Sequence, residues 1–326
     1  MSLSDIHNVF YFAPYVQYII CIFLLLFFFV YSPRTLFTWE DIFIYITMFI
    51  LCLTSYVYGV SMGLSVNIKP FILTTLLVFL NSRLLPVKLL KSFLFFMVAF
   101  LIIEYAVAYT QVIPTFHLGL SRIFSLIRPV GLFLDMHLTA YFVVFSLFAL
   151  GYLKFSGIIS IFLGSYQIVL GWFVVALRKI NPIYIFISFL FIVFILYKVG
   201  HFTLGKGSES MVAVLLNLSD YEVNYDCLIL GCSINIDTLY LANIAGNRDT
   251  VGDFGYYRVL YQFGLLWVIL LVFSLRRYNK LFILANIVMW LHYPVSLGVL
   301  GFIIFIYLLH CMKYKEYIDG NKSKSV

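Results

Sequence analysis

The stretch RDTVGDFGYYRVLYQFGLL places charged side chains where a polar segment runs into an apolar one. Arg248 and Asp253 lie before the apolar part, and Arg258 lies three residues inside it, counted from Gly255. A carboxylate such as Asp253 can accept a proton as a general base, or it can cap a helix. A cation in the first turn opposes the helix dipole, so Arg258 is expected either to act on a substrate or to snorkel to lipid phosphates.

A second polar group occupies SRIFSLIRPVGLFLDMHLTA, before another apolar run. Arg122 and Arg128 are suited to a diphosphate, because a guanidinium fork binds phosphate oxygens in pairs and stays charged. The alternative is an amphipathic helix whose arginines contact lipid headgroups. Asp135, at the start of the next span, is a third candidate for binding a substrate.

Two ionisable residues interrupt apolar segments elsewhere. Glu104 stands in FLIIEYAVAYT, near the outer end of a predicted span, where a carboxylate needs a partner or a role. His292 stands in WLHYP just before Pro294, where a helix is expected to break. Both are predicted to face the same side as the arginines and to contribute to substrate binding. For Glu104 the alternatives are a structural pairing with Arg122 or Arg128 and exposure at the membrane interface, and for His292 the alternative is a structural role.

The elements that position these residues are predicted from composition. Hydrophobic residues make up 63% of the 326 residues and charged residues 11%, against about 45–50% and about 25% in soluble domains. The first long apolar run lacks a preceding positive charge and a cleavage site, which favours an ordinary span over a signal peptide. We therefore predict an all-α polytopic integral membrane protein with about 10–12 transmembrane or re-entrant helices and a single membrane domain covering residues 1–326.

Nine apolar stretches are candidate spans, and two of them are broken. They are Tyr11–Tyr31, Asp41–Val60, Pro70–Asn81, Ser92–Thr110, Leu138–Tyr152, a broken stretch Phe155–Leu177, Ile183–Lys198, Gly255–Leu275 and a broken stretch Leu281–His310. The stretch Phe155–Leu177 is predicted to form two short re-entrant helices hinged at GSYQ, because each half is only about 16 Å long.

One large loop, residues 200–254, is predicted to be external and folded. It holds Glu209, Asp220, Glu222, Asp226, Asp237, Asp249 and Asp253 of the fourteen acidic residues. The basic clusters at Arg178–Lys179 and Arg276–Arg277 flank it and are predicted to be cytoplasmic. An external loop lies in an oxidising compartment, so Cys227 and Cys232 could pair if a turn brings them together, and the sequence leaves this open.

Several functional classes lack their motifs. No phosphate-binding Walker sequence, HExxH or paired CxxC is present, so no ATP-driven transport or zinc proteolysis is predicted. No metal or cofactor is predicted. The net charge of +7 comes from residues at span ends, and no nucleic-acid partner is predicted.

Three stretches together resemble the bacterial O-antigen polymerase (Wzy-type) and ligase superfamily. RPVGLFLDMHLTA is similar to the R-x-x-G-x-F segment before a span, and GDFGYYRVLYQFGLL to the polymerases' D-x-G-Y-x-R-x-x-x-x-x-G pattern after the large loop. LHYPVSLGVLGFIIF is similar to their kinked penultimate span. Asp253 stands where ligases have a His-Asn pair, which favours a polymerase.

The resemblance implies a membrane glycosyltransferase of the bacterial inner membrane with its active site facing the periplasm. It would polymerise undecaprenyl-diphosphate-linked oligosaccharide repeat units, O-antigen or capsular, with a chain-length regulator and membrane lipids as partners. Asp253, Arg128 and Arg258 are the predicted catalytic residues. The predicted substrate-binding residues are Arg122, Glu104, Asp135, Arg248 and His292. The alternatives are an O-antigen ligase, and a transporter or flippase of lipid-linked glycans.

Overall fold

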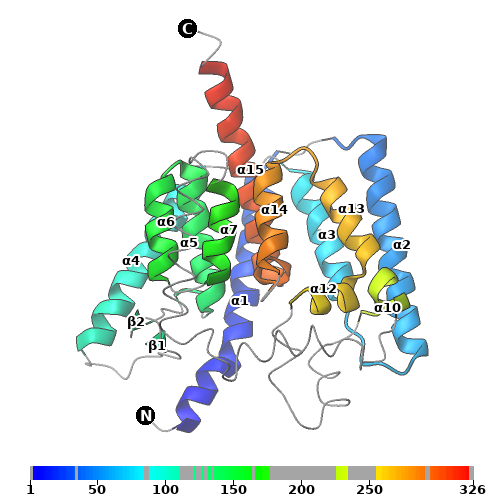
Figure 1. Cartoon of the computed structure of the whole chain (residues 1–326), viewed down its shortest axis with the longest axis horizontal. Coiled ribbons are helices and arrows are strands. Elements are labelled where there is room, and N and C mark those ends of the chain that lie inside the picture. Colours follow the sequence, from blue (N-terminus) through cyan, green and yellow to red (C-terminus); the bar gives the residue numbers. More distant parts are fainter. Residues whose placement is uncertain are drawn as a thin grey trace. The chain divides into compact units, whose positions relative to one another are not determined.

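The computed structural model describes residues 3–33, 36–83, 88–110, 120–121, 126–127, 131–133, 135–163, 166–176, 225–233, 255–290 and 294–322. These residues are helical, except for connecting turns and a short antiparallel ladder between β1 (Leu120–Ser121) and β2 (Leu126–Ile127) (Figure 1). The chain divides into two compact units. Unit 1 comprises Met1–Thr35, Phe79–Ala176 and Val295–Val326, and unit 2 comprises Leu36–Val78 and Leu177–Pro294.

Unit 1 is built around α5 (Met136–Leu150). Its other helices are α1 (Leu3–Tyr31), α4 (Lys88–Thr110), α6 (Leu153–Phe162), α7 (Tyr166–Ala176), the 3-10 turn η1 (Val295–Leu297) and α15 (Val299–Lys322). Helices α4, α6, α7 and α15 all pack against α5. The side chains of α5 from Leu138 to Leu147 are buried on every face of the helix, as expected for a helix without a polar face.

Unit 2 is built around α2 (Trp39–Ser61). Its other helices are α3 (Lys69–Asn81), whose last residues belong to unit 1, α10 (Tyr225–Leu230), α12 (Gly255–Phe263), α13 (Leu265–Ser274) and α14 (Lys280–Met289). Helix α2 packs against α13 and α10. In the core, the buried Trp267 indole donates a hydrogen bond to Thr74 Oγ1 over 2.9 Å, which connects α13 to α3.

The N-terminus of α2 is closed by polar contacts. Thr38 and Asp41 form a reciprocal capping box. Arg277 lies 3.1 Å from an Asp41 carboxylate oxygen, and Arg276 lies 2.6 Å from Glu40. The connection between α13 and α14 is therefore bound to the first turn of α2.

Both predicted helix breaks are confirmed. The stretch Phe155–Leu177 forms two helices, because α6 ends at Phe162 and α7 begins at Tyr166. The stretch Leu281–His310 is divided into α14, η1 and α15. At the second break, a Cβ atom added to Gly301 would collide with the Val295 carbonyl oxygen, so only glycine allows η1 to lie this close to α15. The candidate span Ile183–Lys198 lies outside the described residues.

The prediction of one continuous span from Gly255 to Leu275 is wrong. Helix α12 ends at Phe263, and α13 begins at Leu265. Gly264 between them has a φ of +83°, a left-handed backbone conformation that interrupts a right-handed helix. Arg258 therefore lies on α12, a separate helix of nine residues, and not inside the apolar helix α13.

Two helical segments are long and apolar enough to cross a membrane, namely Trp39–Ser61 and Leu89–Ala106. Only 28% and 22% of their most apolar windows are buried inside the protein. A core helix of a soluble protein would have most of that surface covered. Seven shorter apolar helices accompany them among the described residues.

Candidate functional site

The end of the RPVGLF segment is held tightly in unit 1. Phe133 is fully buried against the rings of Phe93 and Phe142, and its carbonyl oxygen accepts a hydrogen bond from Gln17 Nε2 over 3.0 Å. Gly131 has a φ of +62°, and a Cβ atom there would lie 2.7 Å from the Thr139 side chain. The backbone thus passes close to the first turns of α5, where only glycine fits without displacement.

Glu104 on α4 reaches this segment. Its Oε2 atom accepts a hydrogen bond from the Gly131 backbone N–H over 3.0 Å. A carboxylate in an apolar helix needs such a donor. The expected pairing of Glu104 with Arg122 or Arg128 concerns residues outside the described part of the chain.

Asp135 is the N-cap of α5. Its Oδ1 atom accepts hydrogen bonds from the backbone N–H groups of His137, over 2.8 Å, and Leu138, over 3.0 Å. The carboxylate thereby satisfies two of the amides that a helix start leaves unpaired. Its negative charge also stands at the positive end of the helix dipole.

The imidazole of His137, in the first turn of α5, contacts the first turn of α7. Its Nδ1 atom lies 3.1 Å from Nε2 of Gln167, whose side chain is buried. Which group donates depends on the histidine tautomer and the amide orientation. In either arrangement the amide fixes the ring, and a histidine oriented by a second group is suited to proton transfer.

These four residues define the α5 cluster: Glu104, Asp135, His137 and Gln167. Only Glu104 and Asp135 were predicted from the sequence. His137 follows Asp135 by two positions, and Gln167 is the last residue of the GSYQ hinge, so both lie beside features that the sequence marks. What the sequence did not indicate is that the hinge meets the start of α5.

The α5 cluster combines two carboxylates, an imidazole and an amide. Such a set can accept hydrogen bonds and protons from sugar hydroxyl groups, whereas binding a diphosphate would require cations. Within the described part of the chain, no three His, Cys, Asp or Glu side chains lie close enough to hold a metal ion.

The remaining predicted site residues are placed only in part. Arg258 lies on α12 in unit 2. Arg122, Arg128, Arg248, Asp253 and His292 lie outside the described residues, so their roles stay predictions.

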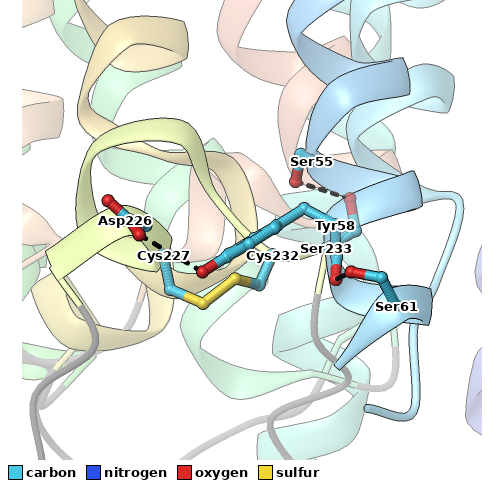
Figure 2. Close-up of a disulfide and its surroundings, with 7 residues drawn as sticks. All are labelled: Ser55, Tyr58, Ser61, Asp226, Cys227, Cys232 and Ser233. Carbon is cyan, nitrogen blue, oxygen red and sulfur yellow. Dashed lines mark hydrogen bonds between the residues drawn. A yellow bond between two sulfur atoms is a disulfide. The ribbon is translucent and has the colours of Figure 1, made fainter. Parts of the chain in front are cut away.

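The pairing left open by the sequence is present, because Cys227 and Cys232 form a disulfide with Cα atoms 5.0 Å apart. Figure 2 shows the disulfide beside the last turns of α2, where the Tyr58 hydroxyl donates to Asp226 Oδ2 over 3.3 Å. The described part of the loop is thus folded against unit 2.

Comparison of the chain with models of known families, with curated proteins and with solved structures finds no match.

Proposed function

We propose that this protein is a polytopic membrane glycosyltransferase that polymerises lipid-diphosphate-linked oligosaccharide repeat units on the outer face of the bacterial inner membrane. The observation that carries the proposal is the α5 cluster. Asp135 and His137 follow the RPVGLF segment directly, Glu104 accepts from Gly131 of that segment, and Gln167 contacts His137. Such an enzyme needs a group that accepts the proton of a sugar hydroxyl and cations that bind the diphosphate. The α5 cluster offers the first, and Arg122 and Arg128 are predicted to offer the second.

The exposed side of α2 supports a membrane location. Its exposed residues recur every three or four positions, as one stripe of Phe43, Ile46, Ile50, Leu53, Val57 and Val60, each 52–72% exposed. The stripe is about 26 Å long at 1.5 Å per residue, close to the hydrocarbon thickness of about 30 Å. Water would make such a face unfavourable, whereas acyl chains would cover it.

The two ends of α2 support the proposed orientation. Arg276 and Arg277 contact its first turn, and basic residues in short connections favour the cytoplasm. The disulfide lies at its other end, where Tyr58 is about 26 Å along the helix from Asp41. Disulfides persist in oxidising compartments outside the cytoplasm. Two independent kinds of residue therefore favour the same orientation.

In the proposed reaction, a hydroxyl oxygen of the acceptor repeat unit attacks the anomeric carbon of the donor glycan. The bond between that carbon and the diphosphate oxygen breaks, and the lipid diphosphate leaves with the bonding electrons. Its developing charge would be stabilised by Arg128 and Arg258. The hydroxyl proton would pass to a general base, with Asp253 as the predicted acceptor. The diphosphate already supplies the activation, so the transfer itself consumes no nucleotide.

Deletion of the gene tests the proposal directly. In a strain that makes a long surface glycan, we expect the deletion to leave single repeat units on lipid A core and no longer chains on a gel. A glycan-free core would instead favour the ligase or a flippase, because no repeat unit reaches the core without both flipping and ligation. A normal ladder would refute all three functions.

The orientation gives a separate prediction. A periplasm-dependent alkaline phosphatase fused after Asn235, within the large loop, should be active, and a cytoplasmic reporter at the same position should be silent. A matched fusion after Tyr278, beside Arg276 and Arg277, should give the reverse pattern. Activity of the phosphatase at Tyr278 alone would invert the topology and contradict an external site.

A further inference from the structure

Residues 225–233, inside the large loop, form a short helix and a turn that a disulfide closes. Helix α10 ends at Leu230, and Gly231 follows with a φ of +80°. This conformation turns the chain back, so that the Gly231 N–H donates to the Cys227 carbonyl over 2.9 Å. The disulfide to Cys232 closes the turn, and both cysteines are buried.

This segment is fitted to the bend between α12 and α13. The Cys232 N–H donates to the carbonyl oxygen of Tyr261 over 2.9 Å. A Cβ atom on Gly231 would lie 2.6 Å from the Phe263 carbonyl carbon, and one on Gly264 would overlap the backbone of Leu230 and Gly231. Two glycine backbones therefore touch at the point where the helix turns.

The other side of the segment is bound to α2 and the turn that follows it. The hydroxyl groups of Ser233 and Ser55 are 2.9 Å apart and buried, and the Ser233 carbonyl accepts from the Asn67 N–H over 2.7 Å. A Cβ atom on Gly59 would collide with the Cys232 carbonyl oxygen. The segment is thus held between α2 and the α12–α13 bend by backbone contacts on both sides.

We propose that residues 225–233 act as a disulfide-closed bracket that sets the bend at Gly264 and thereby positions α12, the helix that carries Arg258. In this arrangement the cysteines and both glycines are positioning residues. The bracket follows from contacts within unit 2 and does not rest on the proposed function.

The disulfide is needed because a segment as short as the bracket does not keep a folded conformation by itself. An isolated helix of six residues such as α10 is unstable in water. Closing the short loop between Cys227 and Cys232 restricts the undocked chain, and by the chain-entropy estimate this favours docking by a factor of roughly 40. Reduction should raise the ratio of undocked to docked protein by the same factor and release the bend.

Thiol counting tests whether the bond exists in the protein. The full-length chain, purified without reductant and then denatured, should add maleimide-polyethylene glycol at three cysteines, Cys21, Cys52 and Cys311, of the five in the chain. After reduction it should add five. Five additions before reduction would overturn the proposal.

Trp267 tests whether the disulfide controls the bend. Its indole packs on Phe263 across Gly264, with centroids 4.5 Å apart, and is buried. The difference emission between the wild type and Trp267→Phe isolates this residue. We expect the difference emission to shift to the red when both Cys227 and Cys232 are replaced by serine, and to stay unchanged in the matched variant Cys21→Ser.

Reduction of the wild-type protein in lipid nanodiscs guards against a serine variant that fails to fold. The red shift of Trp267 should appear with the reductant and disappear on reoxidation. An unchanged emission, in protein that thiol counting shows to be reduced, would overturn the bracket. Because neither measurement involves glycan synthesis, loss of the proposed enzymatic function would leave this outcome unaffected.

Discussion

Replacing Asp253 by asparagine is expected to eliminate long glycan chains while leaving the amount of protein in the membrane unchanged. If Asp253 is the general base of the proposed transfer, asparagine removes the proton acceptor, and loss of a general base typically costs about 10²–10⁴ in rate. If Asp253 only caps a helix, asparagine caps about as well and the change is silent. Gel analysis of surface glycans distinguishes the two, since only the first outcome leaves single repeat units on lipid A core.

Asp135→Asn is the matched control, because the Asp135 carboxylate is seen to cap α5 through two backbone N–H groups. Asparagine should keep those bonds and the amount of protein in the membrane, so a change in the ladder of chains would report the predicted role of the Asp135 charge in substrate binding. A normal ladder in Asp253→Asn would show that Asp253 is not the general base and would leave Glu104 and His137 as the candidates for that role. Lost chains in Asp135→Asn would show that its charge serves the substrate as well as the helix.

Replacing Gly264 by alanine is expected to destabilise unit 2. The backbone angles of Gly264, φ +83° and ψ 151°, lie in a region almost confined to glycine and cost an alanine about 1–3 kcal/mol. The added Cβ atom also meets the backbone of Leu230 and Gly231, where overpacking costs about 1–3 kcal/mol more. The total of about 2–6 kcal/mol should lower the midpoint of thermal unfolding in detergent and raise protease sensitivity in the large loop.

Gly63→Ala is the control that distinguishes the cost of the backbone conformation from the cost of the contact between the new Cβ atom and the bracket. Gly63 has a φ of +68°, similar to that of Gly264, but a Cβ atom there would meet nothing within 4 Å. Only the cost of about 1–2 kcal/mol for the left-handed backbone should remain. Equal losses in the two variants would mean that the contact between the bracket and the bend contributes nothing, and that the backbone conformation alone explains the glycine.

The partners of the site residues show where prediction from sequence stopped. Glu104 was expected to need a partner, and it receives the N–H of Gly131, twenty-seven positions away. The sequence suggested an arginine, and that pairing stays a prediction because Arg122 and Arg128 lie outside the described residues. The Gly131 donor was not indicated, because a sequence shows charged side chains but not which backbone N–H groups are free. His137 and Gln167, thirty positions apart, were missed for the same reason, since nothing in either stretch indicates the other.

The sequence by itself determined what depends on neighbouring residues. Continuous apolar runs indicated the helices, and the hinge at GSYQ and Pro294 indicated both breaks, because these propensities act within a few positions along the chain. Tertiary structure alone decided that α12 and α13 are separate, that Cys227 pairs with Cys232, and that the Gly131 N–H donates to Glu104. No proline or polar turn sequence marks the bend at Gly264, which lies where Gly231 contacts it. Contacts of that kind form between segments far apart in the chain, and local propensity carries no information about them.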